Sequence, residues 1–172
     1  MNTADRSIAL LDTALRRRFG FVELMPDAKV LASVSAGGKV PLGPWLKAIN
    51  ERIRKQVGRD ARNLQIGHAF LLDDGKPVSD FAKFARIVAE DIIPLLEEYC
   101  YEDHAALARI LGPGLVDEER QSIREELFEV ERHAELVQAL LAIEPDMTTE
   151  VEASSEDEEG DDLNDDKGEA GS

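Results

Sequence analysis

Apolar residues recur at helical spacing through the middle of this 172-residue chain. Between Pro44 and Gly58, one face is apolar and the opposite face is charged, which predicts an amphipathic helix that ends at the glycine. The apolar positions of this helix are Trp45, Leu46, Ile49, Ile53 and Val57.

The same periodicity predicts further helices toward the C-terminus. Ser79 or Asp80 can cap a long helix that reaches about Tyr99, and Pro94 should kink or restart it because proline lacks a backbone N–H. A short helix is expected over 107–111, before Gly112-Pro113-Gly114. The last helix is expected over about 116–143, with an apolar stripe of Ile123, Leu127, Val130, Ala134, Val137 and Leu140.

The N-terminal part has a different pattern. A short amphipathic helix is predicted over about 7–17, and the aromatic and β-branched run 19–24 has strand character before a proline ends it. Residues 27–44 contain three glycines and two prolines, which predicts a linker loop. We therefore expect four regions: the helix and strand of 1–26, a linker over 27–44, a helical unit over 45–143, and a tail over 144–172.

Charge is concentrated at the C-terminus. The formal net charge is −16, and residues 149–172 hold eleven acidic residues and one lysine. With almost no apolar residues, this tail cannot offset its own ordering entropy and is expected to be disordered. No basic face dominates the rest, so direct DNA binding by this chain is not expected. One cysteine, the lack of a signal-like run and the lack of a membrane-length apolar stretch predict a cytoplasmic protein with no membrane contact.

The most informative motif lies in residues 1–19. Met-Asn-Thr-Ala-Asp-Arg-Ser at 1–7, followed by Leu-Asp-x-Ala-Leu-Arg-Arg-Arg-Phe at 11–19, resembles the signature of McrB-type AAA+ NTPases, the motor subunits of modification-dependent restriction systems. The resemblance implies that Asn2 is the first sensor of the nucleotide's terminal phosphate. A neutral amide can orient the attacking water without adding negative charge near that phosphate.

The same resemblance implies roles for the charged residues of the motif. Arg17 and Arg18 would be arginine fingers that act on the nucleotide of the neighbouring subunit, since guanidinium groups stay charged and present a fork of donors. Asp5 and Arg6 would support the signature loop. From the residues alone, cations at a helix C-terminus can also simply satisfy the helix dipole and the last carbonyl groups.

Three further runs resemble the helical lid of the same family: Leu46–Ile53, Gln65–Phe70 and Ile92–Tyr99. Many relatives have Gln-Ile-Gly-His-Ser-Tyr-Phe where this chain has Gln-Ile-Gly-His-Ala-Phe, so two hydroxyl groups are missing. His68 could contact nucleotide from the lid, or it could be a hydrogen-bonded structural residue. The fold implied is mainly α: a helical AAA+ lid-like subdomain, preceded by a remnant helix and strand of an α/β AAA+ core and followed by the acidic tail.

The resemblance also implies cofactors and partners. GTP or ATP with magnesium would bind in the parent assembly, a ring of AAA+ subunits expected to be hexameric, together with a McrC-like endonuclease subunit. No cofactor is expected on this chain alone, because its nearest match to a phosphate-binding loop, residues 33–40, lacks the first glycine and the final hydroxyl. No metal site is predicted, since Cys100 and His104 lack a second ligand pair.

Two other interpretations stay open. The chain could be a helical protein–protein interaction module with an acidic tail, derived from such an NTPase. A complete small enzyme is the least favoured, because no nucleophile, metal set or pair of acids is evident in the pattern.

Overall fold

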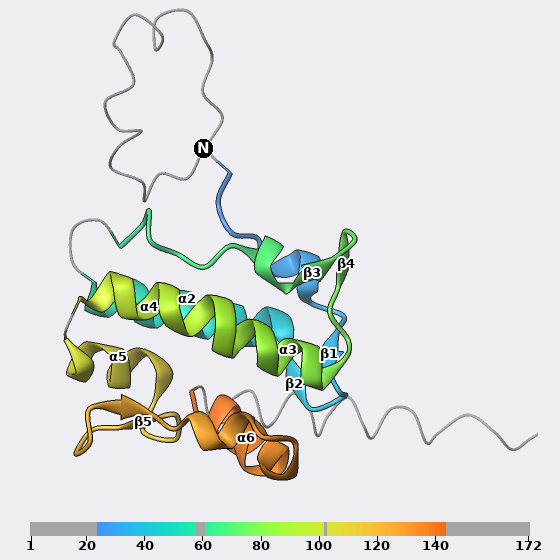
Figure 1. The fold of residues 1–172 in the computed structure, drawn as a ribbon. Coiled ribbons are helices and arrows are strands. Elements are labelled where there is room, and N and C mark those ends of the chain that lie inside the picture. Colours follow the sequence, from blue (N-terminus) through green and yellow to red (C-terminus); the bar gives the residue numbers. More distant parts are fainter. Residues whose placement is uncertain (1–23, 58–60, 102, 144–172) are drawn as a thin grey trace, which may run out of the picture.

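The computed structural model describes residues 24–57, 61–101 and 103–143 (Figure 1). This part of the chain is mainly helical, as the sequence predicted. Its helices are α2 (Leu42–Gln56), α3 (Phe81–Ile87), the π-helix η5 (Val88–Ile92), α4 (Ile93–Cys100), α5 (His104–Leu111) and α6 (His133–Leu141). Short 3-10 turns lie at η2 (Ala28–Leu31), η4 (His68–Leu71), η6 (Glu125–Phe128) and η7 (Val130–Arg132). The segments 1–23 and 144–172, with their predicted helix, strand and acidic tail, lie outside the described residues.

The described residues also form three small antiparallel hairpins. They are β1–β2 (Ser35–Ala36 with Val40–Pro41), β3–β4 (Leu72–Asp73 with Lys76–Pro77) and β5–β6 (Val116–Asp117 with Ser122–Ile123). Each strand has two residues, so the hairpins connect helices and do not build a sheet layer. None of the described helices is both long and apolar enough to cross a membrane.

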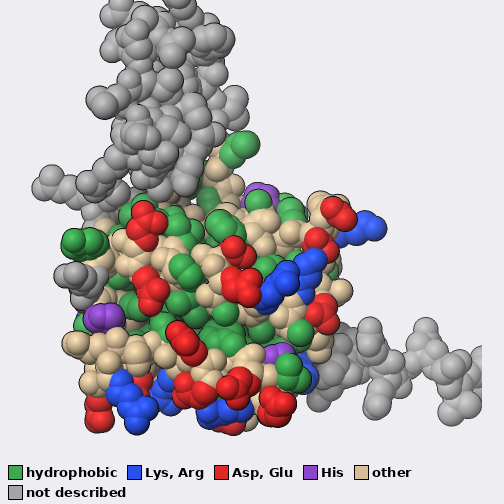
Figure 2. All heavy atoms as spheres, in the orientation of Figure 1, with side chains coloured by type: hydrophobic (Ala, Val, Ile, Leu, Met, Phe, Trp, Pro, Cys, Tyr) green, Lys and Arg blue, Asp and Glu red, His purple; other side chains and the backbone are tan. Residues whose placement is uncertain are grey.

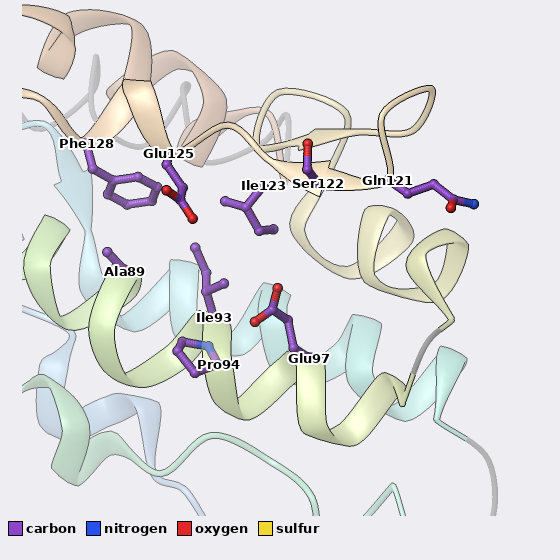
Figure 3. A pocket seen from close by; sticks show the side chains of 9 residues that line it. All are labelled: Ala89, Ile93, Pro94, Glu97, Gln121, Ser122, Ile123, Glu125 and Phe128. Carbon is purple, nitrogen blue, oxygen red and sulfur yellow. The ribbon is translucent and has the colours of Figure 1, made fainter.

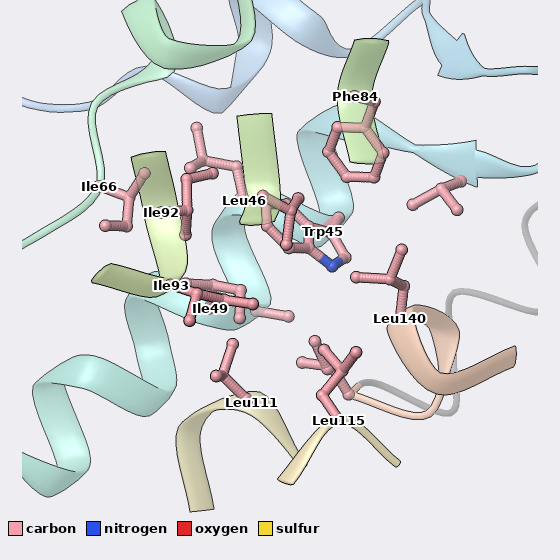
Figure 4. Packing of buried hydrophobic residues seen from close by; sticks show 14 of the residues in the cluster. Trp45, Leu46, Ile49, Ile66, Phe84, Ile92, Ile93, Leu111, Leu115 and Leu140 are labelled. Carbon is pink, nitrogen blue, oxygen red and sulfur yellow. The ribbon is translucent and has the colours of Figure 1, made fainter. Parts of the chain in front are cut away.

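One apolar core joins all the helices. Helix α2 lies behind the rod formed by α3, η5 and α4, while α5 and α6 lie below them in Figure 1. The predicted apolar face of α2 is buried, with Trp45, Leu46, Ile49 and Ile53 fully inaccessible to solvent. These side chains meet residues from each of the other helices, among them Phe84, Ile92, Leu111 and Leu140 (Figure 4). The rings of Trp45 and Phe84 pack edge to face, with centroids 5.1 Å apart.

The long helix predicted over 79–99 forms, and its interruption has a clear cause. The Asp80 side chain caps α3 by accepting from the Lys83 N–H at 2.7 Å, as expected for an N-cap. One turn before Pro94 the rod widens into η5, where the Ile93 N–H donates to the Val88 carbonyl. The helix then restarts as α4 with the proline in its first turn, where an N–H is not required.

The expectation of a linker over 27–44 is wrong for these residues. Leu31, Ala36, Val40 and Leu42 are completely buried, so the segment is part of the core. Its glycines form a tight hairpin turn, and Gly43 lets η2 approach α2 so closely that a Cβ atom there would lie 2.9 Å from the Ala28 carbonyl oxygen. The glycines of this segment therefore allow tight turns and close packing, and they do not indicate a flexible linker.

The prediction of a single helix over 116–143 is also wrong. Residues 116–132 form β5–β6, η6 and η7, and only His133–Leu141 is α-helical. The Asp117 carboxylate accepts from the Glu119 and Arg120 N–H groups, which starts a turn in competition with a helix. Val130, which the stripe placed on the apolar face, is 73% exposed.

Candidate functional site

The residues expected to act directly on nucleotide, Asn2, Arg17 and Arg18, and their supports Asp5 and Arg6, lie outside the described residues. Of the candidate site residues, the structure places His68, and it also shows what holds that residue in position.

His68 lies in η4, beside the start of the described chain. Its Nδ1 atom accepts a hydrogen bond from the Asp27 backbone N–H at 3.0 Å. Nδ1 must therefore be unprotonated in this arrangement, which puts the ring proton on Nε2. The bond joins the segment before η2 to η4 across 41 residues of sequence. This hydrogen bond is consistent with the structural role considered for His68, and a nucleotide contact through Nε2 stays a prediction.

Asn50 fixes the segment that leads to His68. Asn50 is 5% exposed and lies on α2. Its side-chain nitrogen donates to the Ile66 carbonyl at 2.9 Å, and its side-chain oxygen accepts from the Ile66 N–H at 2.7 Å. A single amide thus satisfies both backbone groups of a buried residue that has no strand partner. Asn50 was assigned no role from the sequence, although an asparagine among the apolar positions of a predicted helix is a usable signal.

Arg52 holds two helix ends together. Its Nη1 atom donates to the carbonyl groups of Arg109 at 3.1 Å and Ile110 at 3.3 Å, in the last turn of α5. Its Nη2 atom donates to the Ile143 carbonyl, just beyond α6. A guanidinium group at the end of a helix satisfies carbonyls that have no partner within the helix. Arg52 belongs to the charged face predicted for this helix, and no local pattern in the sequence indicates that it reaches α5 and α6.

The turn of the loop that partly matches a phosphate-binding motif already uses its consecutive N–H groups within the protein. Gly37 donates to the Ser79 carbonyl at 2.7 Å, Gly38 to Ser35 at 3.2 Å and Lys39 to Ala36 at 3.0 Å. In a phosphate-binding loop, consecutive N–H groups point at the ligand. In this chain they close the β1–β2 hairpin and join it to the start of α3.

Cys100 and His104 do not make a metal centre in the described structure. They line a small cavity of about 180 Å³ with Glu97, Asp103 and Leu107. Burial raises the pKa of the Cys100 thiol to about 11, and Asp103 adds to this rise while Arg109 opposes it. A thiol that holds its proton so firmly is a poor metal ligand. Across residues 24–57, 61–101 and 103–143, no group of three or more His, Cys, Asp or Glu side chains could hold a metal ion.

The comparisons with known proteins agree with this architecture, which is that of a small helical lid domain. Residues 41–108 match the family described as "McrB, alpha-helical lid domain". The chain thus carries a helical lid of the McrB type. The match includes α2 with Asn50 and Arg52, the His68 segment, the α3–α4 rod and the start of α5.

One curated relative gives a wider match. The "Type IV methyl-directed restriction enzyme EcoKMcrB subunit" of Escherichia coli (strain K12) is 36% identical over 114 residues, which are 60% of this chain and 25% of the relative. The chain therefore spans about a quarter of the length of the relative it matches. No solved structure matches the chain.

Proposed function

We propose that this chain is the sensor, arginine-finger and lid portion of an AAA+ NTPase motor in a restriction system. The observation that carries the proposal is the 36% identity to a methyl-directed restriction subunit, together with the McrB lid match over 41–108. The proposed sensor and finger residues precede the lid along the chain. The nucleotide would be GTP or ATP with magnesium.

In the proposed mechanism, the chain contributes positioning and charge to phosphoryl transfer. Asn2 would orient the attacking water, and Arg17 and Arg18 would stabilise the charge that develops on the phosphoryl oxygens of a neighbouring subunit's nucleotide. Asp5 and Arg6 would support the loop that carries Asn2. His68 would contact nucleotide from the lid, in a segment that the two hydrogen bonds between Asn50 and Ile66 hold against α2.

The phosphate cradle would come from elsewhere in the assembly. This is supported by the hairpin 33–40, whose consecutive N–H groups already donate within the protein. Tested alone, these 172 residues should neither bind nor hydrolyse GTP or ATP. In the assembly, the partners would be further AAA+ subunits in a hexameric ring and a McrC-like endonuclease subunit.

The test uses the assembled motor that supplies the phosphate-binding loop. Arg17→Ala and Arg18→Ala should each lower GTP or ATP turnover by about 10³-fold or more and leave nucleotide binding measurable, because a finger acts mainly in the transition state. Lysine should rescue poorly, since it keeps the charge and loses the forked geometry. Arg16→Ala is the matched control and should have a small effect.

A mixing experiment places the fingers between subunits. A subunit without its fingers and a subunit without its phosphate-binding lysine should regain partial turnover when mixed, because each supplies what the other lacks. Full activity of the Arg17/Arg18 double alanine variant would contradict the proposal and leave these arginines as ordinary helix-end cations.

A further inference from the structure

A groove separates α4 from the β6–η6 segment. It encloses about 480 Å³, and its lining includes Ala89, Ile93 and Glu97 on the helical side and Ile123, Glu125 and Phe128 on the other. The hairpin β5–β6, which carries one wall of the groove, lies below α4 in Figure 1.

The polar groups of the groove favour a cation. Glu97 and Glu125 point into it from opposite walls (Figure 3), and no lysine or arginine is among the lining residues. Within the described residues, neither carboxylate takes part in an ion pair or a side-chain hydrogen bond. Figure 2 shows acidic side chains beside an exposed apolar strip on this face.

The π-helix leaves one backbone carbonyl, that of the groove-lining residue Ala89, without its usual helical donor. In an α-helix, the carbonyl of Ala89 would accept from the Ile93 N–H, but that N–H donates to Val88. In a π-helix, the donor to the Ala89 carbonyl would be the N–H of residue 94, but this residue is a proline and has no N–H. The helix therefore offers Ala89, a groove-lining residue, neither of the usual donors for its carbonyl.

The rest of the groove is apolar. Ile93 and Ile123 supply aliphatic surface near the two carboxylates, and the Phe128 ring lies beside Glu125 (Figure 3). A cationic group on an apolar stem is complementary to this lining, because it can meet both carboxylates and the apolar side chains, whereas an anion would be repelled by the two acids.

We propose that this groove binds a segment of a partner polypeptide that presents an arginine beside an apolar residue. A guanidinium group has five donors, enough for both carboxylates and a backbone carbonyl, and its flat face can stack on the Phe128 ring. Its methylene stem suits the apolar surface between the acids. This inference does not rest on the proposed NTPase function.

The test measures binding to the full chain. The probe is a short fluorescein-labelled peptide that alternates leucine and arginine, and the matched probe carries citrulline, a neutral isostere, in place of arginine. The arginine peptide should bind, and the Glu97→Gln/Glu125→Gln variant should raise its Kd by about fivefold or more. The control variant Glu98→Gln/Glu119→Gln removes the same charge from two exposed glutamates that do not line the groove, and it should change Kd by less than about twofold.

Each remaining outcome overturns the proposal. An equal rise in Kd for both double variants would show diffuse attraction to an acidic surface. Equal binding of the citrulline peptide would show that the carboxylates do not select the ligand. If free spermidine competed with similar affinity and the same dependence on Glu97 and Glu125, the occupant would be a small polyamine and not a polypeptide.

Discussion

The side chain of Asn50 forms a two-way hydrogen bond with the backbone of Ile66: the amide nitrogen donates to the carbonyl at 2.9 Å, and the amide oxygen accepts from the N–H at 2.7 Å. Ile66 is completely buried, so water cannot replace either bond. The amide of one helix residue thereby determines where the Gln65–His68 segment lies.

Replacing Asn50 by alanine should lower the free energy of unfolding by about 2–4 kcal/mol, because it leaves two buried backbone groups unsatisfied. Urea unfolding of the full chain, followed by circular dichroism, measures the loss. Lys47→Ala, at an exposed position of the same helix, should change stability by less than about 0.5 kcal/mol. A similar effect of both substitutions would mean that the Asn50 contacts contribute nothing specific.

Arg52→Lys should destabilise the chain by about 1–2 kcal/mol although the charge is kept, because an ammonium group cannot donate to carbonyls on two helices at once. Amide exchange should increase near the ends of α5 and α6. Arg54→Lys, two residues along the helix and exposed, is the control and should leave exchange unchanged. If amide exchange at those helix ends stayed unchanged in Arg52→Lys, the bridging role would be wrong.

Gly37 and Gly38 give a matched pair of substitutions in the β1–β2 turn. Both have a positive φ, 59° and 67° respectively, so alanine at either position costs about 1–2 kcal/mol of backbone strain. A Cβ atom at Gly37 would also lie 2.8 Å from the Phe81 Cβ, whereas at Gly38 nothing lies within 4 Å. Gly37→Ala should therefore lower the thermal midpoint more than Gly38→Ala. Equal midpoints would show that the turn moves away from α3 without cost.

The single cysteine gives a pH test. Since burial and Asp103 raise the pKa of Cys100 from 9.0 to about 11, its alkylation by iodoacetamide should be slow at neutral pH and half-maximal near pH 11. In urea, the midpoint should fall toward the ordinary value. The linked stability change follows from this difference: the unfolded thiol loses its proton first, so folding stability should fall as pH rises from 9 toward 11. An alkylation midpoint at or below 9 in the folded chain would contradict the burial of this thiol.

The packing of residues 27–44 predicts where the folding unit must begin. A chain that starts at Pro44 should lack a cooperative thermal transition, because it loses Leu31, Ala36, Val40 and Leu42 from the core. A chain that starts at Leu24 should keep the transition of the full chain. Cooperative unfolding of the shorter chain at the same midpoint would restore the view that 27–44 is only a linker.

The sequence predicted helices best where one local pattern decides the structure. The stripe from Trp45 to Ile53 predicted α2, and Asp80 with Pro94 predicted the start and the interruption of the α3–α4 rod. The errors occurred where turn and hairpin hydrogen bonds override the helical periodicity of the apolar residues. Around 116–132 the helical stripe is outweighed by the Asp117 turn and by a hydrogen bond from the Arg124 N–H to the Leu115 carbonyl.

The candidate site was less accessible to sequence reasoning. Asn50 and Arg52 lie in a run that resembles the family, yet their partners are 16 and more than 50 residues away along the chain. The groove likewise brings Glu97 and Glu125 to one site. Their proximity depends on the β5–β6 hairpin and η6, in a region where the sequence predicted a single helix. For residues 1–19 the sequence is more informative than the structure. They carry the strongest motif of the chain, and the Arg17→Ala and Arg18→Ala variants test the roles predicted from it.

The buried indole of Trp45 has a spectroscopic consequence. It is the only tryptophan among the 172 residues, it is fully buried, and its N–H has no hydrogen-bond partner among the described residues. The fluorescence of an indole that is shielded from water has its maximum at short wavelength, because no water dipoles reorient around the excited state. The emission colour of the native chain therefore reports the contact between α2 and α3 without any label, and a shift to the red would reveal the moment at which water reaches this core.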